Sequence, residues 1–293
     1  MTKTNQQKVK DFLINNGVII VMFILVIYTG FTSDNFFTKN NFMNILMNMS
    51  SRLVIALGIA GCVITAGCDL SAGRMIGFGA CISGMLLQRM DYSGKFFPDM
   101  QPLNVFVVAL IAMLVCAAFG TVTGFFIAYL NVPPFIATLA MMEIVYGIGL
   151  IVTNATPLGG YVEQYTNVSN GKFLGINYLI WIAIIVAAIT WFIFNMTRHG
   201  KYMYAIGGNP QAAEVAGVPV KATLILIYMK AAAMYGLAGF MLGAKAGGAS
   251  VQTGYGYEME AIAACTIGGV SVTGGRGKVS SAIIGVAVFE LLK

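Results

Sequence analysis

The chain has 293 residues, of which 58% are hydrophobic and only 10% are charged, and its mean hydropathy is +0.81. Soluble domains carry roughly 25% charged residues, so this composition excludes a water-soluble protein and indicates a polytopic membrane protein. The net charge of +6 is spread over several loops and gives no reason to expect a nucleic-acid partner. One His and five scattered Cys without metal-ligand spacing favour neither a metal site nor a disulfide framework.

Apolar segments follow one another along almost the whole chain, so we expect an all-α fold with about eight spans or partial spans. A full crossing needs roughly 20 apolar residues, and several segments are shorter, which predicts tilted or broken helices. The 35 glycines favour close packing of helices in lipid. The predicted spans are Gly17–Gly30, Leu53–Ala66, Met75–Leu87, Leu103–Leu130, Phe135–Val152, Tyr178–Phe194, Leu224–Gly243 and a last one from Val279.

Two basic regions predict the orientation of the chain. They contain Lys3, Lys8 and Lys10 before the first span, and Arg198, Lys201 and Lys221 in the polar loop at about 196–222. No small-residue cleavage site follows the first apolar segment, so it is expected to remain as a span. Six predicted crossings separate the two regions, which puts both on the side that the positive-inside rule makes cytoplasmic. Basic residues in the opposite loops weaken the charge bias, so the even number of crossings carries this prediction.

Two Gly-rich segments share the pattern G-x-[DS]-[LV]-[ST]-[AG]-G-R: Gly67–Arg74 and Gly269–Arg276. Each follows one apolar run and precedes another. Breaks at corresponding places in two halves of a transporter point to its translocation pathway, because unwound backbone in a membrane has to line protein or water. Coincidence in a Gly-rich chain is the alternative, and a parallel and an inverted repeat are both open.

The polar loop contains a second local signal, a short capped helix. Asn209 suits the N-cap, Pro210 the first helical position and Gly217 a left-handed stop, which predicts a helix over Pro210–Ala216. Small side chains leave its surface bare, so another protein's backbone has room to approach. We interpret the segment as a docking element, with an ordinary loop helix as the alternative. Its contact residues are expected to be Asn209, Pro210, Gln211, Ala212, Ala213, Glu214 and Gly217.

Four blocks in order carry a specific resemblance: VITAGCDLSAGR (63–74), IAYLNVPPFIATL (127–139), the loop at 197–218, and YEMEAIAACTIGGVSVTGGRG (257–277). Together they resemble the permeases of the ribose/galactose branch of bacterial ABC sugar importers. The pattern A-A-x-x-x-G from Ala212 to Gly217 is similar to the coupling-loop motif of such permeases. The run AYLNV and the loop LLQRMDYSGKFFPDM are more similar to galactose/methylgalactoside members than to ribose members.

This resemblance implies a single transmembrane permease domain over residues 1–293 in the bacterial inner membrane, with a cytoplasmic N-terminus. It also implies four kinds of partner: a second permease copy, a cytoplasmic ATPase, an extracytoplasmic sugar-binding protein and surrounding lipid. ATP and Mg belong to the ATPase, and no cofactor is expected on this chain. The implied substrate is a monosaccharide, galactose, glucose or a methylgalactoside, with ribose or another pentose as the alternative. Because family members usually extend beyond the position of Lys293, closing helices are expected to be missing.

Polar residues within the spans are candidates for lining the pathway, since ionisable groups are costly in lipid. Asp69 is placed to cap a helix that begins near Ser71, and Arg74 offers several donors to a sugar or a carbonyl; a structural cap and a satisfied buried arginine are the alternative. Aromatic side chains such as Tyr146 suit the apolar face of a pyranose ring, although core packing explains most of them. The remaining candidates are Asn131, where a turn is the alternative, Glu143, with Lys230 as its expected partner, and Thr273 and Arg276 in the second Gly-rich segment.

Three classes of function compete. An ABC importer permease needs a docking helix and no nucleotide motif, and the sequence has no G-x-x-x-x-G-K-[ST] run. A secondary transporter needs paired carboxylates or a charged ring in its spans, which Glu143 alone approaches. A membrane enzyme needs a nucleophile or metal constellation, for which the one His is insufficient. The sequence therefore favours the permease and predicts no enzymatic activity.

Overall fold

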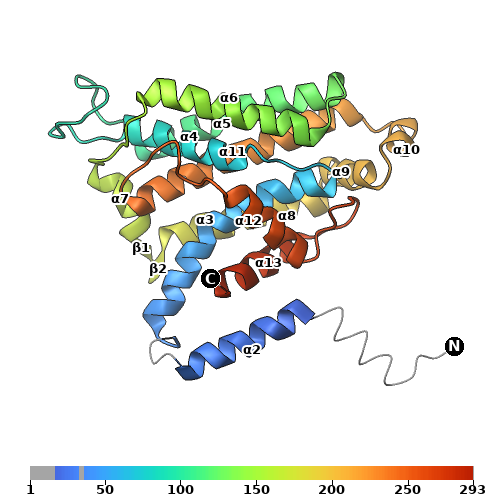
Figure 1. Cartoon of the computed structure of the whole chain (residues 1–293), viewed down its shortest axis with the longest axis horizontal. Helices are drawn as coiled ribbons and strands as arrows, with labels where there is room; N and C mark the ends of the chain where they lie inside the picture. The colour runs from blue at the N-terminus through green and yellow to red at the C-terminus, as the bar shows by residue number, and fades with distance from the viewer. Residues whose placement is uncertain (1–16, 33–35, 293) are drawn as a thin grey trace.

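The computed structural model describes residues 17–32 and 36–292. In this part of the chain the fold is a bundle of helices with one two-stranded sheet (Figure 1). Five helices are long and apolar enough to cross a membrane, which confirms the prediction of an all-α polytopic membrane protein. They are α3 (Lys39–Ile64), α5 (Val105–Tyr129), α6 (Pro134–Thr153), α8 (Tyr178–Met196) and α11 (Val220–Ala246).

Four further apolar helices are shorter than a full crossing: α2 (Gly17–Thr32), α4 (Ala72–Leu86), α12 (Tyr257–Ile267) and α13 (Val279–Leu291). At about 1.5 Å per residue, α4 with its 15 residues is roughly 22 Å long, against a hydrocarbon layer of roughly 30 Å. The non-helical residues 65–71 precede α4, and a non-helical segment precedes each of α12 and α13. The prediction of broken spans is therefore confirmed.

One predicted boundary is wrong and one helix was not predicted. The second span was expected to begin at Leu53, yet α3 begins at Lys39. A polar first half extends this helix, because the Thr38 hydroxyl caps it by accepting from the Asn41 backbone N–H at 3.3 Å. The helix α12 was not predicted at all, because glycines on both sides make its apolar run too short to suggest a span.

The centre of the bundle is formed by α3 and α11. Within the most apolar window of each helix, 78% of α3 and 56% of α11 is buried, against 22% of α5. Helix α11 packs along α5, α4 and α3 (Figure 1). Helices α5, α6 and α8 carry many exposed apolar side chains. A membrane protein needs such an apolar outer surface because lipid surrounds it.

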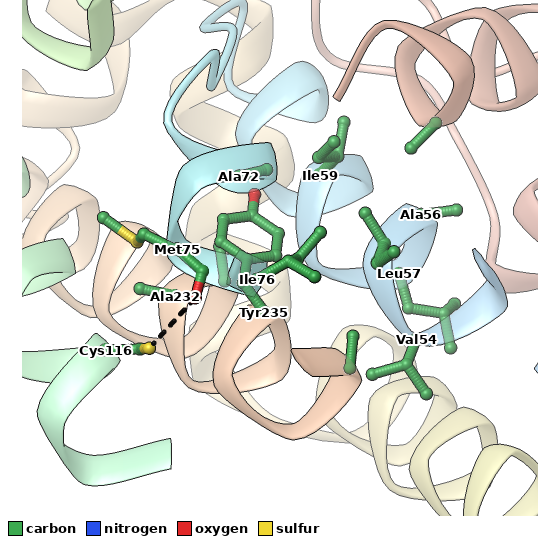
Figure 2. Packing of buried hydrophobic residues seen from close by; sticks show 14 of the residues in the cluster. Val54, Ala56, Leu57, Ile59, Ala72, Met75, Ile76, Cys116, Ala232 and Tyr235 are labelled. Atoms are coloured by element: carbon green, nitrogen blue, oxygen red, sulfur yellow. Dashed lines mark hydrogen bonds between the residues drawn. The ribbon is translucent and has the colours of Figure 1, made fainter. Parts of the chain in front are cut away.

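Close contact between α4 and α11 depends on glycine. A Cβ added at Gly79 would lie 2.9 Å from the Cα of Gly236, so Gly79 has no room for a side chain, and a Cβ added at Gly236 would lie 2.4 Å from the Ala112 carbonyl oxygen of α5. Figure 2 shows Met75 and Ile76 of α4 beside Tyr235 of α11, with α3 on the opposite side. Small residues at a helix interface allow this approach, as the glycine content predicted.

An ionic network ties the C-terminal helices to α3. The Arg52 guanidinium makes an ion pair with Glu260 of α12, with an Nε–Oε2 distance of 3.2 Å, and a second with Glu290 of α13. It also lies over the Tyr257 ring at 5.2 Å from the centroid. The side chains of Arg52 and Glu290 are only 15% and 5% exposed, so this network is largely shielded from water.

The connecting segments gather at two opposite ends of the bundle (Figure 1). One end carries the loop at 88–102, helix α7 (Glu163–Asn170) and the hairpin of β1 (Lys172–Phe173) and β2 (Ile176–Asn177). The other end carries α9 (Arg198–Gly208) and α10 (Pro210–Val215). Helix α2 begins toward the end that holds α9 (Figure 1), and the predicted basic region before it lies outside the described residues.

Candidate translocation pathway and coupling helix

The first Gly-rich break joins α3 to α4 by a non-helical segment, residues 65–71. Asp69 is buried in it, and its Oδ1 accepts hydrogen bonds from the Ser71 backbone N–H at 3.0 Å and the Ser71 hydroxyl at 2.6 Å. A carboxylate at this place also interacts favourably with the positive end of the helix dipole. Helix α4 then begins at Ala72. The predicted helix break is confirmed. The predicted cap is not, because Ser71 is the N-cap and Asp69 bonds to Ser71 without reaching a backbone N–H of the helix itself.

Two tyrosines of α11 face this break. The phenol oxygens of Tyr228 and Tyr235 are buried. The Tyr235 hydroxyl interacts with the Asp69 carboxylate, whereas that of Tyr228 has no hydrogen-bond partner within residues 17–32 and 36–292. Gly67 packs on Tyr228, since an added Cβ would lie 2.5 Å from the phenol oxygen. Figure 2 shows the Tyr235 hydroxyl directed toward Ala72. The break therefore brings buried polar groups into the interior of the bundle, where each gains from a polar partner.

Arg74, in the first turn of α4, is held by a second break, the segment between α11 and α12. Its guanidinium carbon lies 3.9 Å from the ring centroid of Tyr146 and 4.3 Å from that of Tyr255. Its Nη1 donates to the side-chain oxygen of Gln252 at 2.8 Å and to the Val251 carbonyl at 3.3 Å. Gln252 in turn donates from Nε2 to the Tyr146 hydroxyl at 3.1 Å. Three elements distant in sequence thus form one polar and aromatic cluster.

The other predicted pathway residues lie elsewhere. Asn131 is exposed in the turn between α5 and α6 with a φ of +53°, so the turn-forming alternative is confirmed for its backbone. Thr273 and Arg276 are exposed in the second Gly-rich segment, next to α9 rather than to Arg74. The structure therefore brings Asp69, Ser71 and Arg74 to one region and leaves these three residues outside it.

The expected pairing of Glu143 with Lys230 is wrong. Glu143 is exposed on α6, and no ion pair joins the two among the described residues. Lys230 instead lines a small cavity against α9 together with His199. The physical reason is the position of α11, which packs between α5 and α3 and turns Lys230 away from α6.

The predicted coupling helix forms almost as expected. Helix α10 begins at Pro210, the Asn209 side chain caps it by accepting from the Ala212 backbone N–H at 3.0 Å, and Gly217 takes a left-handed φ of +82°. One prediction is wrong: Ala213 is buried against its own chain and not part of a bare surface. The exposed face instead contains Ala212 and Val215, whose side chain is 90% exposed. Gln211 and Glu214 are exposed as well.

Helix α9, which the sequence pattern did not reveal, connects α10 to both Gly-rich segments. Gly207 packs against the Ile64 carbonyl at the end of α3, where an added Cβ would clash. The Ile64 carbonyl also accepts from the Gly275 backbone N–H at 2.8 Å, and the Tyr204 hydroxyl donates to the Gly277 carbonyl at 2.8 Å. Helix α9 therefore links α10 by direct contacts to both Gly-rich segments.

The only His of the chain lies on α9. Burial, with a smaller contribution from the nearby Lys230 charge, lowers the pKa of His199 to about 4. The imidazole is consequently neutral at physiological pH. It packs in the wall between α9 and α11 and does not supply a reactive group.

Sequence reasoning missed several members of the Arg74 cluster. Tyr146 was considered as an aromatic candidate, but Gln252, Tyr255 and Glu258 were not. Glu258 begins α12 and is 6% exposed, with its Oε2 buried and unpaired among the residues described. A carboxylate inside the apolar block YEMEAIAACTIGG was a usable signal, because ionisable residues in membrane segments are functional candidates.

These features define a class of protein. It is a polytopic helical protein whose broken helices carry polar groups into the membrane, as the permeases of transport systems do. A short capped helix projects from one end. Residues 41–293 match the family described as branched-chain amino acid transport system/permease component. The chain therefore belongs to this family of permeases. It is a transport subunit and not an enzyme.

Comparison with individual proteins narrows the relationship. The chain is 39% identical over 299 residues to the galactose/methyl galactoside import permease protein of Escherichia coli (strain K12), covering 100% of the chain and 89% of that protein. It is 40% identical over 299 residues to the protein of the same description from Haemophilus influenzae, with the same coverage. The ribose import permease protein of Escherichia coli (strain K12) is 32% identical over 287 residues, covering 97% of the chain and 86% of that protein. The predicted sugar-permease family is confirmed, and no solved structure matches the chain.

Proposed function

We propose that the chain is the permease of a bacterial ABC importer that moves galactose or a methylgalactoside into the cytoplasm. The observation that carries the proposal is the full-length identity of 39–40% to galactose/methyl galactoside import permeases, against 32% to a ribose import permease. The broken helices and the Arg74 cluster supply polar groups for a hydroxylated substrate. The cell inner membrane is the location that such a permease requires.

ATP hydrolysis belongs to a separate cytoplasmic subunit that holds ATP and Mg. A soluble sugar-binding protein delivers substrate at the opposite end, where the loop at 88–102 and the hairpin project. A second copy of the chain completes the pathway. The placement of α10 and of this hairpin at opposite ends of the bundle supports the arrangement, with α10 and the N-terminus on the cytoplasmic side.

The ATPase contact is the exposed face of α10. The Asn209 cap and the left-handed Gly217 fix the helix at both ends, so little conformational entropy is lost on docking. Val215 provides the apolar side chain, and Ala212 beside it leaves room for a groove to close over the helix. An exposed branched apolar side chain on a rigid, small-residue helix fits a protein groove.

The test is to place a charge on this face. Val215→Asp is expected to lower ATP-driven galactose uptake roughly tenfold or more, because a carboxylate would be desolvated at the centre of the contact. The matched control is Leu174→Asp in the hairpin at the other end, where the native residue is 78% exposed. Because the proposed binding protein meets that end, this control is expected to keep ATPase co-purification at the wild-type level, whatever its effect on uptake. Uptake, protein yield and ATPase co-purification are measured for both variants. Equal uptake and equal ATPase co-purification in the two variants would exclude α10 as the contact.

A further inference from the structure

The Arg74 cluster lies at the level where two half-helices begin. α4 starts at Ala72 and α12 at Tyr257, and their first turns meet: a Cβ added at Gly73 would collide with the Glu258 carboxylate. Tyr146 comes from near the middle of α6, which crosses the whole membrane. The cluster therefore lies at the level of the membrane-spanning helices and not at the end of the protein that carries α9 and α10.

One side of this cluster is open. The side chain of Tyr255 is 60% exposed, Gln252 is exposed, and Arg74 and Tyr146 are half-buried. Arg74 Nε and Glu258 Oε2 are buried without a hydrogen-bond partner in the described part of the chain. Buried polar atoms without partners are destabilising, so they indicate a site that gains from a polar ligand or water.

A pyranose suits this arrangement. Its apolar C–H face matches an exposed tyrosine ring, and its hydroxyl groups both donate and accept hydrogen bonds. Arg74 only donates, the Glu258 carboxylate only accepts, and the Gln252 amide does both. Two helix N-termini at the same place favour the partial negative charge of hydroxyl oxygens. An inorganic ion would bind poorly to this cluster, because the Arg74 guanidinium is fixed between the Tyr146 and Tyr255 rings.

We propose that Arg74, Tyr146, Gln252 and Tyr255 form a transient sugar-contacting surface within the pathway, with Glu258 behind it. The Tyr255 ring stacks against the pyranose ring, and the Gln252 amide forms hydrogen bonds with the sugar hydroxyl groups. Arg74, stacked between Tyr146 and Tyr255, fixes the Tyr255 ring and donates to the sugar. This inference rests on the proposed transport function and identifies the part of the pathway that handles a hexose.

The test separates sugar handling from ATPase coupling. The full chain is reconstituted in vesicles with its ATPase and with galactose-loaded binding protein, and both labelled galactose uptake and ATP hydrolysis are measured. Tyr255→Leu is expected to lower the galactose moved per ATP by roughly three- to tenfold, because the aromatic platform is lost. Tyr255→Trp keeps a platform and is expected to retain coupling near the wild-type value. Gln252→Leu is expected to reduce coupling in the same direction as Tyr255→Leu.

The control is Tyr129→Leu, since Tyr129 is also half exposed and also lies under a cation, with Lys221 Nζ 5.1 Å from its ring centroid. Unchanged coupling in Tyr255→Leu, as in the control, would overturn the inference. A parallel loss of uptake and ATP hydrolysis would also overturn it, because the ring would then only support the loop. If the wild-type chain moves no galactose at all, the proposed function fails first, and the variants are not needed to show it.

Discussion

Removing the charge of Arg52 is expected to destabilise the protein strongly. This guanidinium joins α3 to α12 and α13 through Glu260 and Glu290. In Arg52→Gln the Glu290 carboxylate keeps its position, with a side chain only 5% exposed, and loses its cationic partner. Taking one member out of a buried ion pair costs about 3–5 kcal/mol, because the other charge remains desolvated.

The matched control is another ion pair of the described residues, in which Arg89 Nε lies 3.6 Å from Asp91 Oδ1. Its side chains are 53% and 76% exposed, so Arg89→Gln is expected to cost at most about 1 kcal/mol. A third variant, Arg52→Met with Glu290→Met and Glu260→Gln, removes the buried charges together. It is expected to recover most of the loss, since well-packed apolar residues often replace a buried pair without cost.

The assay uses the protein's own thiols. Cys62 and Cys265 are fully buried, so a thiol-reactive dye reports unfolding of the purified protein in detergent during heating. Arg52→Gln should react at a clearly lower temperature than wild type, and Arg89→Gln at nearly the same temperature. Equal midpoints for Arg52→Gln and Arg89→Gln would refute the view that the network holds α12 and α13 in place.

Two further predictions use the same dye assay. Gly79→Ala is expected to destabilise the protein by roughly 1–3 kcal/mol, because its Cβ would lie 2.9 Å from the Cα of Gly236. The control is Gly147→Ala, which has open space around it and is expected to be neutral or slightly stabilising. Indistinguishable unfolding midpoints for the two variants would contradict the packing argument. The second prediction concerns His199, whose pKa is about 4 in the folded protein against 6.5 in the unfolded chain. Between these two pH values the unfolded chain binds more protons than the folded protein, so the folding stability falls as the pH drops through this window. Between about pH 7.5 and about pH 5.5 the wild type is expected to lose roughly 1 kcal/mol more than His199→Gln, and parallel pH profiles would show that the imidazole is not protected.

The sequence predicted the helical class and the short capped helix α10 because those features are local. Asn209, Pro210 and Gly217 each act through backbone geometry within a few residues, and all three behave as expected. Asp69 likewise bonds only two residues further along the chain. Such short-range chemistry can be read without knowledge of the fold.

The Arg74 cluster could not be predicted from the sequence, because its members come from distant parts of the chain. Arg74 meets Gln252 across 178 residues, and Gln252 meets Tyr146 across 106, so no spacing rule connects them. The same holds for Arg52 and Glu290, 238 residues apart. Ala213 was assigned to the wrong face because the helix is too short for periodicity to show which side is covered. The pairing of Glu143 with Lys230 was wrong because charge complementarity does not establish proximity.

The central claim, a galactose permease driven by a separate ATPase, is tested most directly by uptake into sealed vesicles. The vesicles contain this chain and its ATPase, with ATP on the α10 side and sugar-loaded binding protein on the other. We expect galactose to accumulate only with hydrolysable ATP, and faster than ribose supplied through a ribose-loaded binding protein. Accumulation driven by a sodium or proton gradient without ATP, or a preference for ribose, would contradict the account.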